Sequence, residues 1–534
     1  MYPYLIKILD KVREFYQANG KRIVRRFFSR DGTKFRTVVL GQEYGAPSRF
    51  PDLLLVDEHL FHSPNMKDVE CSLSDCLSLV EVKKKKAESP YYKRMRHEDD
   101  VKGILSQAGD YARLHLAARP FQLFGTYLLI YGDMFCIARF DRYGISLSRE
   151  EPMYTWSSDS NKPVVCKLQQ KFIDVAAQFM TIVDEKVFGA DPGVIPIRSP
   201  EQTVKFSVPV GLSTWTTLEG EPFWASMSLL GRGTAVWKVT SDPQTPGTVR
   251  ILKNAWRLEG RMSEKDIYDK ICAVLEDRRG LMEVIAGGDV FNAEADSQFT
   301  RLDVAYLRQG LTSDTDGAPL ASISAGYNPV LHRVVYGAIG KPLWEFNTEV
   351  EFMKGLRAIV SVLARFHDLG IMHRDISPGN LYLSIQQDPG DGMEGLISDY
   401  EFAHAPNMTE RCTDVTVEVP VASGDRKHGS SIPNVFRETL KASWGPVPIP
   451  DERDAGPPIA GTANFFALEL LEWLLADPPK PKPKPQPAQV GEKKDEKPGP
   501  SRNISKPTPR LGHLDLAGDI LILGNVILVF LQFL

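Results

Sequence analysis

The chain has 534 residues, 43% hydrophobic and 25% charged, which is the composition of a globular protein with enough apolar residues for more than one domain. A formal net charge of −4 gives no overall attraction to nucleic acid, so such binding would need a local basic patch. Six cysteines without a Cys-x-x-Cys pair favour a reducing compartment and argue against a disulfide framework or a structural zinc. The N-terminal segment mixes charged with apolar residues, unlike a signal peptide, so we expect an intracellular, cytoplasmic or nuclear protein.

Residues 1–190 have the pattern of a β-rich sheet with flanking helices, which predicts an α/β domain. Apolar side chains at helical spacing predict an amphipathic helix over residues 5–18, ended by Asn19-Gly20. A second helix, over residues 101–117, carries Gln107, Asp110 and Tyr111 on or near one face. Apolar runs predict strands over residues 53–56, 76–82, 121–131 and 134–140. The Gly/Pro-rich residues 191–200 mark the end of this domain.

Three polar residues lie beside two of these strands. Asp52 precedes the first strand, and Glu81 and Lys83 share one face of the second because side chains alternate along a strand. Asp52 and Glu81 could hold a divalent ion while Lys83 helps to activate water. The arrangement resembles the PD-(D/E)xK pattern of the restriction-endonuclease-like fold. A solvated lysine-rich strand end, residues 83–86, and a degenerate nuclease are the alternatives, so nucleic acid is a weakly supported partner.

The next segment, residues 200–476, begins with strands. Gly231 and Gly233 occupy a turn where small residues let backbone N–H groups approach phosphates, although an ordinary hairpin turn is the alternative. Lys253 lies at the end of an apolar strand, and a helix over residues 263–277 follows. A long helix over residues 348–369 has one apolar side, formed by Phe352, Leu356, Ile359, Val360, Leu363 and Phe366.

The stretch after that helix, residues 371–385, carries the chemistry. His373-Arg374-Asp375 is followed five residues after the aspartate by Asn380. Asp375 can accept the proton of a hydroxyl, and Asn380 offers an amide oxygen to a magnesium ion. A predicted hairpin then delivers Asp399, a further carboxylate for a metal.

These motifs resemble the fungal-type protein kinase family over most of residues 1–476. The matching stretches are LGRGTAVWKV, ILKNAW, IGKPLWEF, IMHRDISPGNLYL, ISDYEFA and GTANFFALELL. The resemblance implies an α+β chain in which a bilobal protein-kinase-like domain follows the endonuclease-like α/β domain. It implies ATP contacts at Gly231, Gly233 and Lys253, with Glu264, or alternatively Glu276, as the partner of Lys253. It further implies Asp375 as catalytic base and Asn380 and Asp399 as Mg²⁺ ligands.

The sequence departs from the kinase pattern at several positions. Val236 stands where the phosphate loop has a third glycine, Glu401 replaces the glycine after the metal-binding aspartate, and Ser377 replaces a lysine typical of serine/threonine kinases. We expect transfer of the ATP γ-phosphoryl group to a protein hydroxyl, with serine or threonine as the expected acceptor. The alternatives are a nucleotide-binding pseudokinase scaffold and a metal-dependent nuclease using the N-terminal domain.

The C-terminal part changes composition. Residues 477–512 are rich in proline and lysine and predict an extended linker. Residues 513–534 are apolar but contain Asp515, Asp519 and Asn525, which are unfavourable in a membrane span. We therefore expect a helix that docks on the helix preceding Asp375, and no membrane partner.

Overall fold

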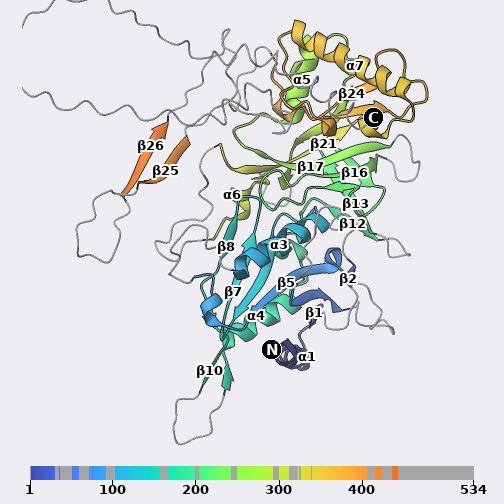
Figure 1. Cartoon of the computed structure of the whole chain (residues 1–534). Coiled ribbons are helices and arrows are strands. Elements are labelled where there is room, and N and C mark those ends of the chain that lie inside the picture. The colour runs from blue at the N-terminus through green and yellow to red at the C-terminus, as the bar shows by residue number, and fades with distance from the viewer. Residues whose placement is uncertain are drawn as a thin grey trace, which may run out of the picture. The chain divides into compact units, whose positions relative to one another are not determined.

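The computed structural model describes most of the first 405 residues and one later hairpin (Figure 1). The described residues are 2–29, 35–36, 51–58, 71–91, 103–156, 166–198, 204–241, 249–292, 300–311, 323, 326–337, 339–405, 415–421 and 436–442. The predicted linker 477–512 and the apolar segment 513–534 lie outside them. The chain divides into two compact units, the first with Met1–Lys265 and Glu283–Ile339, the second with Asp266–Met282 and Gly340–Glu410.

The first sheet of unit 1 is built from the N-terminal strands in the order β1-β3-β5-β6-β7-β8, with β9 beside β7. Among the described strands of this sheet, only β5 and β6 are paired in parallel. The helix α3 connects them, because two parallel strands need a crossover connection. The elements are α1 (Tyr2–Ala18), β1 (Arg25–Ser29), β3 (Leu53–Asp57), β5 (Cys76–Lys83), α3 (Gly103–Ala118), β6 (Gly125–Tyr131), β7 (Met134–Phe140), β8 (Ile145–Leu147), β9 (Glu151–Pro152) and α4 (Gln170–Thr181).

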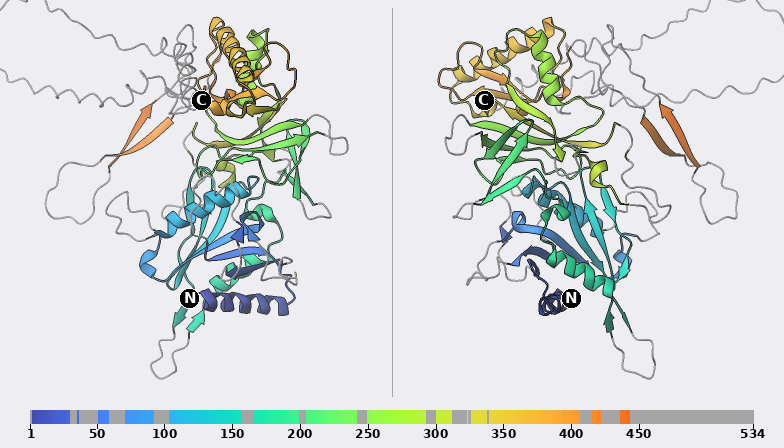
Figure 2. Two further views of the ribbon diagram at one scale, coloured as in Figure 1. Left: turned by 45° about the vertical axis from the view of Figure 1, so that its right-hand side comes forward. Right: turned by 180° about the vertical axis from the view of Figure 1, so that it is seen from behind.

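Helices cover both faces of this sheet (Figure 2). Along β3, Leu53 and Leu55 pack with α1 and α4, whereas Leu54 and Val56 pack with α3. This alternation follows from the two-residue period of a strand. The four side chains are at most 1% exposed, and burying each contributes about 1.5–3 kcal/mol. Unbroken apolar runs such as β3 therefore occur because neither face meets water.

The second sheet of unit 1 is antiparallel throughout its described strands, in the order β12-β13-β14-β16-β17-β21-β18, with β15 beside β16. The strands are β12 (Ile195–Arg198), β13 (Val204–Val210), β14 (Ser213–Thr217), β15 (Trp224–Ala225), β16 (Ala235–Thr240), β17 (Arg250–Leu258), β18 (Val284–Asp289) and β21 (Pro329–Tyr336). Every residue of β21 is buried, so both faces of the sheet are covered there.

One face of the second sheet packs against the segment that leads into β6. The ring of Phe121 stacks on Trp237, with centroids 4.5 Å apart, and both belong to one apolar cluster. Two buried ion pairs add to this contact: Arg333 donates to Asp191, and Arg308 donates two hydrogen bonds of 2.7 and 2.8 Å to Asp141. Such pairs are stable only when well hydrogen-bonded, since desolvating the charges is costly. The two sheets therefore form one compact unit.

Smaller elements complete unit 1. Short pairs connect β2 (Phe35–Arg36) with β4 (Cys71–Ser72), β10 (Tyr154–Trp156) with β11 (Cys166–Leu168), and β19 (Phe291–Asn292) with β20 (Thr300–Arg301). The short helix α6 (Val304–Leu307) follows β20, with Asp303 as its N-cap. The hairpin of β25 (Val415–Val421) and β26 (Phe436–Ala442) makes a separate two-stranded sheet.

Unit 2 is built around the long helix α7 (Glu349–Asp368), which Thr348 caps by accepting the Glu351 N–H. The helix packs on the sheet β22 (Gly340–Pro342), β23 (Leu381–Ser384) and β24 (Gly395–Ile397). Two glycines allow the close approach: a Cβ on Gly395 would lie 2.1 Å from the carbonyl oxygen of Gly355. The helix α5 (Glu264–Val274) contributes its residues from Asp266 onward to this unit.

The structure corrects three local predictions. The strand expected from Phe121 begins at Gly125, because residues 121–124 pack against the second sheet instead. Lys253 lies in the middle of β17 rather than at its end. Val360, predicted on the apolar side of α7, is 44% exposed, whereas Val362 is fully buried. The buried stripe of α7 passes through Val362 because the 3.6-residue period places it beside Ile359 and Phe366.

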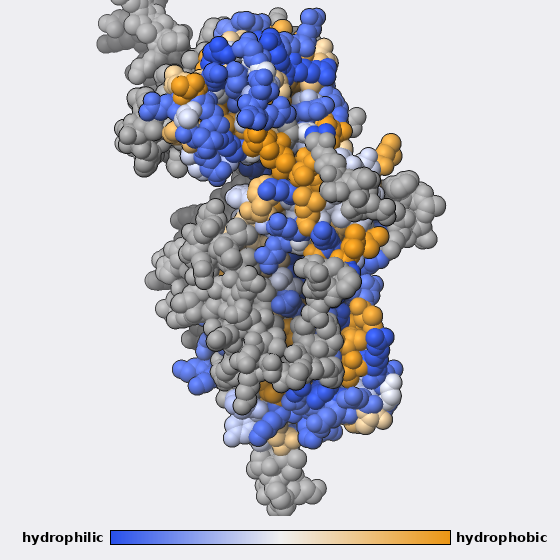
Figure 3. All heavy atoms as spheres, turned by 90° about the vertical axis from the view of Figure 1, so that its right-hand side faces the viewer, coloured by the Kyte–Doolittle hydropathy of each residue, from blue (hydrophilic) through white to orange (hydrophobic). Residues whose placement is uncertain are grey.

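The surface of the described residues is mixed. In the view of Figure 3, hydrophilic residues cover most of it, and apolar residues form an interrupted band. Apolar atoms contribute a large part of the accessible surface of any globular protein, so this band by itself indicates no function. No helix within the described ranges is long and apolar enough to cross a membrane.

Candidate functional site

Lys253 and Glu264 form a buried ion pair in unit 1. The Lys253 Nζ lies 2.8 Å from Glu264 Oε2, and the two residues are 7% and 2% exposed. The hydroxyl of Tyr336, on β21, donates to the other oxygen of Glu264. The alternative partner, Glu276, lies beyond the last residue of α5. The ion pair holds the ammonium group of Lys253, which lies in β17, at a defined position, as phosphate recognition requires.

The glycine-rich loop joins β15 and β16. The N–H of Ser226 donates to the carbonyl of Thr234 across 2.7 Å and closes the loop at its base. Gly231 and Gly233 have φ angles of +83° and +46°, in the left-handed region that favours glycine. In the register of the sheet, Val236 lies opposite Lys253, so the loop ends directly beside the strand that carries the lysine.

In unit 2, the loop before β23 brings Asp375 and Asn380 together. The Asn380 Nδ2 donates to the backbone oxygen of Asp375 at 2.8 Å and to its Oδ2 at 3.0 Å. Asp375 is 5% exposed. His373 Nε2 lies 3.0 Å from the carbonyl oxygen of Ser398, which ties the loop to the end of β24. The amide of Asn380 orients the carboxylate through its nitrogen, which leaves its oxygen as the atom suited to a cation.

Two residues of this loop region have a left-handed backbone without being glycine. Arg374 has a φ of +64° and Asp399 a φ of +62°. Such conformations cost about 1–3 kcal/mol each and are concentrated at functional sites. Asp399 comes two residues after the end of β24, and Asn380 immediately precedes β23. The β23–β24 register pairs Leu381 with Ile397, so Asn380 and Asp399 lie beside adjacent strand ends.

Tyr400 is a residue whose place the sequence did not reveal. Its ring is fully buried, 5.9 Å from His373 and 5.4 Å from Tyr268 of α5, measured between centroids. Its hydroxyl donates to the carbonyl oxygen of Ile397 at 2.6 Å and lies 3.1 Å from the carbonyl oxygen of Met282. Tyr400 therefore fixes the backbone next to Asp399. The one feature of the sequence that could have indicated this role is the position of an aromatic residue immediately after Asp399.

The donor set fits magnesium bound together with a nucleotide. The described residues contain no group of three or more His, Cys, Asp or Glu side chains that could hold a metal. Asn380 and Asp399 supply one amide and one carboxylate oxygen, and Mg²⁺ is usually held by one or two carboxylates, waters and substrate phosphates. These two residues would hold the ion, which neutralises charge on the phosphates when bound.

A second polar cluster lies on the first sheet of unit 1. Lys83 Nζ is 2.6 Å from Glu81 Oε1 and also donates to Gln107 of α3, while Asp52 accepts the Val82 N–H at 2.7 Å. Burial and then the charge of Asp52 raise the pKa of Glu81 to about 7. The three residues predicted from the sequence are close together, and Gln107 joins them.

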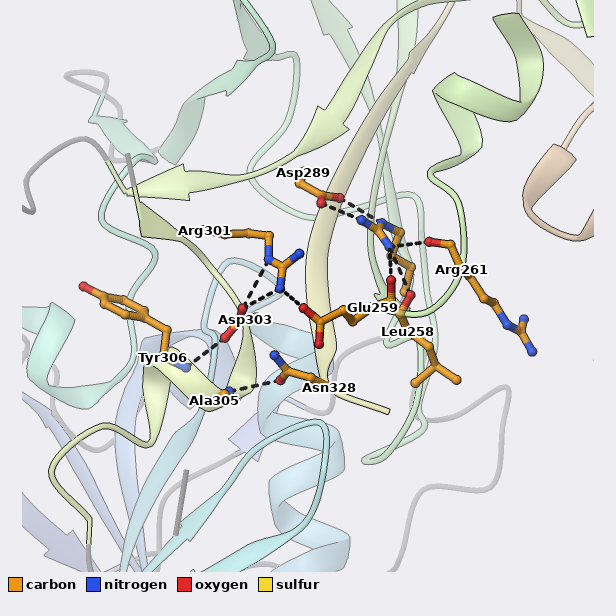
Figure 4. A network of polar contacts seen from close by, with 10 residues as sticks. Leu258, Glu259, Arg261, Asp289, Arg301, Asp303, Ala305, Tyr306 and Asn328 are labelled. Atoms are coloured by element: carbon orange, nitrogen blue, oxygen red, sulfur yellow. Dashed lines mark hydrogen bonds and ion pairs between the residues drawn. The ribbon is translucent and has the colours of Figure 1, made fainter. Parts of the chain in front are cut away.

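A third network belongs to the fold of the second sheet (Figure 4). Arg257 donates to both oxygens of Asp289, at 2.8 and 2.5 Å, and Arg301 bridges Glu259 and Asp303. The network borders a surface pocket of about 620 Å³. Its arginines are already paired with carboxylates and with backbone carbonyls, so we assign it a structural role.

The sequence matches the model of the fungal protein kinase family over residues 50–418. The match includes the glycine-rich loop, Lys253, Asp375 and Asp399, and it also extends into the first sheet of unit 1. A comparison with curated proteins found no match. Because the matched segment covers more than half of the sequence, the chain belongs to the fungal protein kinase family.

Proposed function

We propose that the chain transfers the γ-phosphoryl group of ATP to a protein hydroxyl, with serine or threonine as acceptor. Lys253, oriented by Glu264, would bind the α- and β-phosphates, and Gly231 and Gly233 would let the loop backbone approach them. Asp375 would accept the hydroxyl proton. Asn380 and Asp399 would hold Mg²⁺.

The observation that carries the proposal is the buried Lys253–Glu264 pair. A lysine that is 7% exposed is unusual in a core, and a buried ion pair is weak as a source of stability, since apolar residues of similar volume would serve at least as well. The pair is best explained by a ligand that needs a fixed positive charge. The hydrogen bond from Asn380 to the Asp375 carboxylate supports the role of Asp375 as the proton acceptor, because it holds the carboxylate in one orientation.

We expect the purified chain to phosphorylate itself or a mixture of acceptor proteins in Mg²⁺, and Asp399→Ala to abolish the Mg²⁺-dependent turnover because a ligand of the ion is lost. Incorporation of the terminal phosphate of labelled ATP measures this, and phosphoamino-acid analysis identifies the acceptor. Asp391→Ala, at an exposed carboxylate of the β23–β24 connection, is the control. A parent that binds ATP but transfers nothing would support the pseudokinase scaffold instead.

The cluster around Glu81 supports a second candidate function, metal-dependent cleavage of nucleic acid. Glu81 Oε2 is buried without a hydrogen-bond partner among the described residues, and Asp52 lies close enough to raise the pKa of Glu81. Lys83 could then orient water at a cation held by the two carboxylates. The net charge of −4 gives weak attraction to DNA, so we expect little activity.

Any cleavage by the parent chain should increase between pH 6 and pH 8, because the Glu81 carboxylate is largely protonated below a pKa of about 7 and only its charged form binds a cation. Plasmid nicking with Mg²⁺ or Mn²⁺ measures the effect, with Glu81→Ala to remove it. Asp133→Ala, at a carboxylate that is 43% exposed and does not contribute to the raised pKa of Glu81, is the control. Robust cleavage that Glu81→Ala abolishes would promote the nuclease function; cleavage that persists in that variant would remove Glu81 from it.

A further inference from the structure

The glycine-rich loop is in contact with the turn that joins β7 and β8 of the first sheet. Arg142, in that turn, is 4% exposed, and its Nη1 donates to the carbonyl oxygens of Ser228 at 2.7 Å and Leu229 at 3.2 Å. The backbone oxygen of Arg142 accepts the N–H of Gly231 at 3.3 Å. One residue of the N-terminal sheet therefore binds the loop through both its side chain and its backbone.

Gly233 is the position at which the loop passes closest to this arginine. A Cβ on Gly233 would lie 2.2 Å from Arg142 Cζ and 2.5 Å from its Nε. The other loop glycine, Gly231, has a more open surrounding, with no atom within 4 Å of a Cβ built on it. The absence of a side chain at Gly233 is thus explained by the guanidinium group as well as by its backbone conformation.

The residues on both sides of this contact are themselves held by further contacts. Leu229 packs into the apolar cluster between the first sheet and α3. Asp141, next to Arg142, accepts the N–H groups of Tyr143 and Gly144, each at 3.0 Å, and is ion-paired with Arg308. On the far side of the loop, the N–H of Trp256 in β17 donates to the carbonyl of Arg232 at 2.8 Å. The loop is therefore fixed to both sheets of unit 1.

We propose that Arg142 is a positioning residue for the nucleotide phosphates: by holding the glycine-rich loop, it makes nucleotide affinity depend on the N-terminal sheet. This proposal rests on the phosphoryl transfer proposed above. A free glycine-rich loop would lose conformational entropy when phosphates bind, whereas a loop that is already held does not. Burial lowers the pKa of Arg142 to about 10, so its guanidinium remains charged and donating at pH 7.

Arg142→Ala should raise the KM for ATP and the Kd for MgADP about tenfold, with kcat changed less than about twofold, because hydrogen bonds from a charged donor are lost at the loop and not at the reacting groups. Arg139→Ala is the matched control. Arg139, near the end of β7, is half-buried and donates to the carbonyl of Leu307 at 2.6 Å, and its guanidinium lies over the ring of Phe124, so its described contacts are outside the loop. An unchanged or lower KM in Arg142→Ala, or an equal rise in Arg139→Ala, would overturn the proposal.

A double-mutant cycle tests the contact itself. Gly233→Ala should raise the KM strongly in the parent and less in the Arg142→Ala background, since the added methyl group then meets no guanidinium. Gly231→Ala also places a side chain at a positive φ but meets no atom, so its effect should be additive with Arg142→Ala. Additivity in both cycles would contradict the contact between Gly233 and Arg142.

Hydrogen exchange without nucleotide separates this proposal from the proposed function. Amides of residues 226–234 should exchange about tenfold faster in Arg142→Ala than in the parent or in Arg139→Ala. Unchanged exchange would refute the positioning role even in an active kinase. Faster exchange in a chain that binds no nucleotide would refute the proposed function, and with it the role of Arg142 in nucleotide affinity, while the anchoring of the loop would stand.

Discussion

Replacing Asp375 by asparagine should lower the rate of phosphoryl transfer by about 10²–10⁴-fold, the usual contribution of a general base. An asparagine is nearly the same shape and can still accept the hydrogen bond from Asn380 Nδ2, which is 3.0 Å in the parent. It cannot accept a proton from the incoming hydroxyl. The chemical step should therefore slow while nucleotide affinity stays within about threefold.

Single-turnover transfer from labelled ATP measures the rate, and calorimetric titration of MgADP measures the affinity. Asp368→Asn is the control, because this carboxylate is 80% exposed at the end of α7 and is given no role in catalysis. Melting temperatures close to that of the parent would show that both variants are folded. A rate for Asp375→Asn within about threefold of the parent would remove Asp375 as the base.

Lys253→Met should destabilise the chain by about 3–5 kcal/mol, because it leaves Glu264 buried at 2% exposure without its cation. Glu264 would still accept the hydrogen bond from the hydroxyl of Tyr336, but this neutral donor does not replace the positive charge of the lysine. The double variant Lys253→Met/Glu264→Gln should recover most of this loss, since neutral groups of similar size are less costly to bury. Neither variant should bind ATP productively, because both lack the ammonium group.

Urea unfolding followed by circular dichroism measures the stability, and ATP titration measures the binding. The control is the Lys341–Glu351 pair of unit 2, with a distance of 2.6 Å but side chains 17% and 29% exposed. Lys341→Met should cost less than about 1 kcal/mol. If the double variant were as unstable as the single one, an unpaired charge could not be the cause. If it bound ATP as the parent does, Lys253 would not be the phosphate ligand.

Local patterns in the sequence predicted several helices and strands, and they indicated the residues to which the proposed chemistry is assigned. Helical spacing predicted α1, α3 and α7, and unbroken apolar runs predicted β3 and β5, because these patterns reflect which sides of an element are buried. The spacing of Asp375 and Asn380 indicated a kinase-like loop, since both belong to one short segment whose geometry depends on few bonds. The family match confirms that resemblance.

Contacts between distant segments were decided only by the tertiary structure. Gln107 accepts a hydrogen bond from Lys83 because α3 packs across the face of the first sheet, and the sequence of neither element indicates this contact. Arg142 and Ser228 are 86 positions apart in the chain, and nothing in either neighbourhood indicates the other. A pattern within one element records its own burial, whereas a contact between elements depends on how whole sheets pack together.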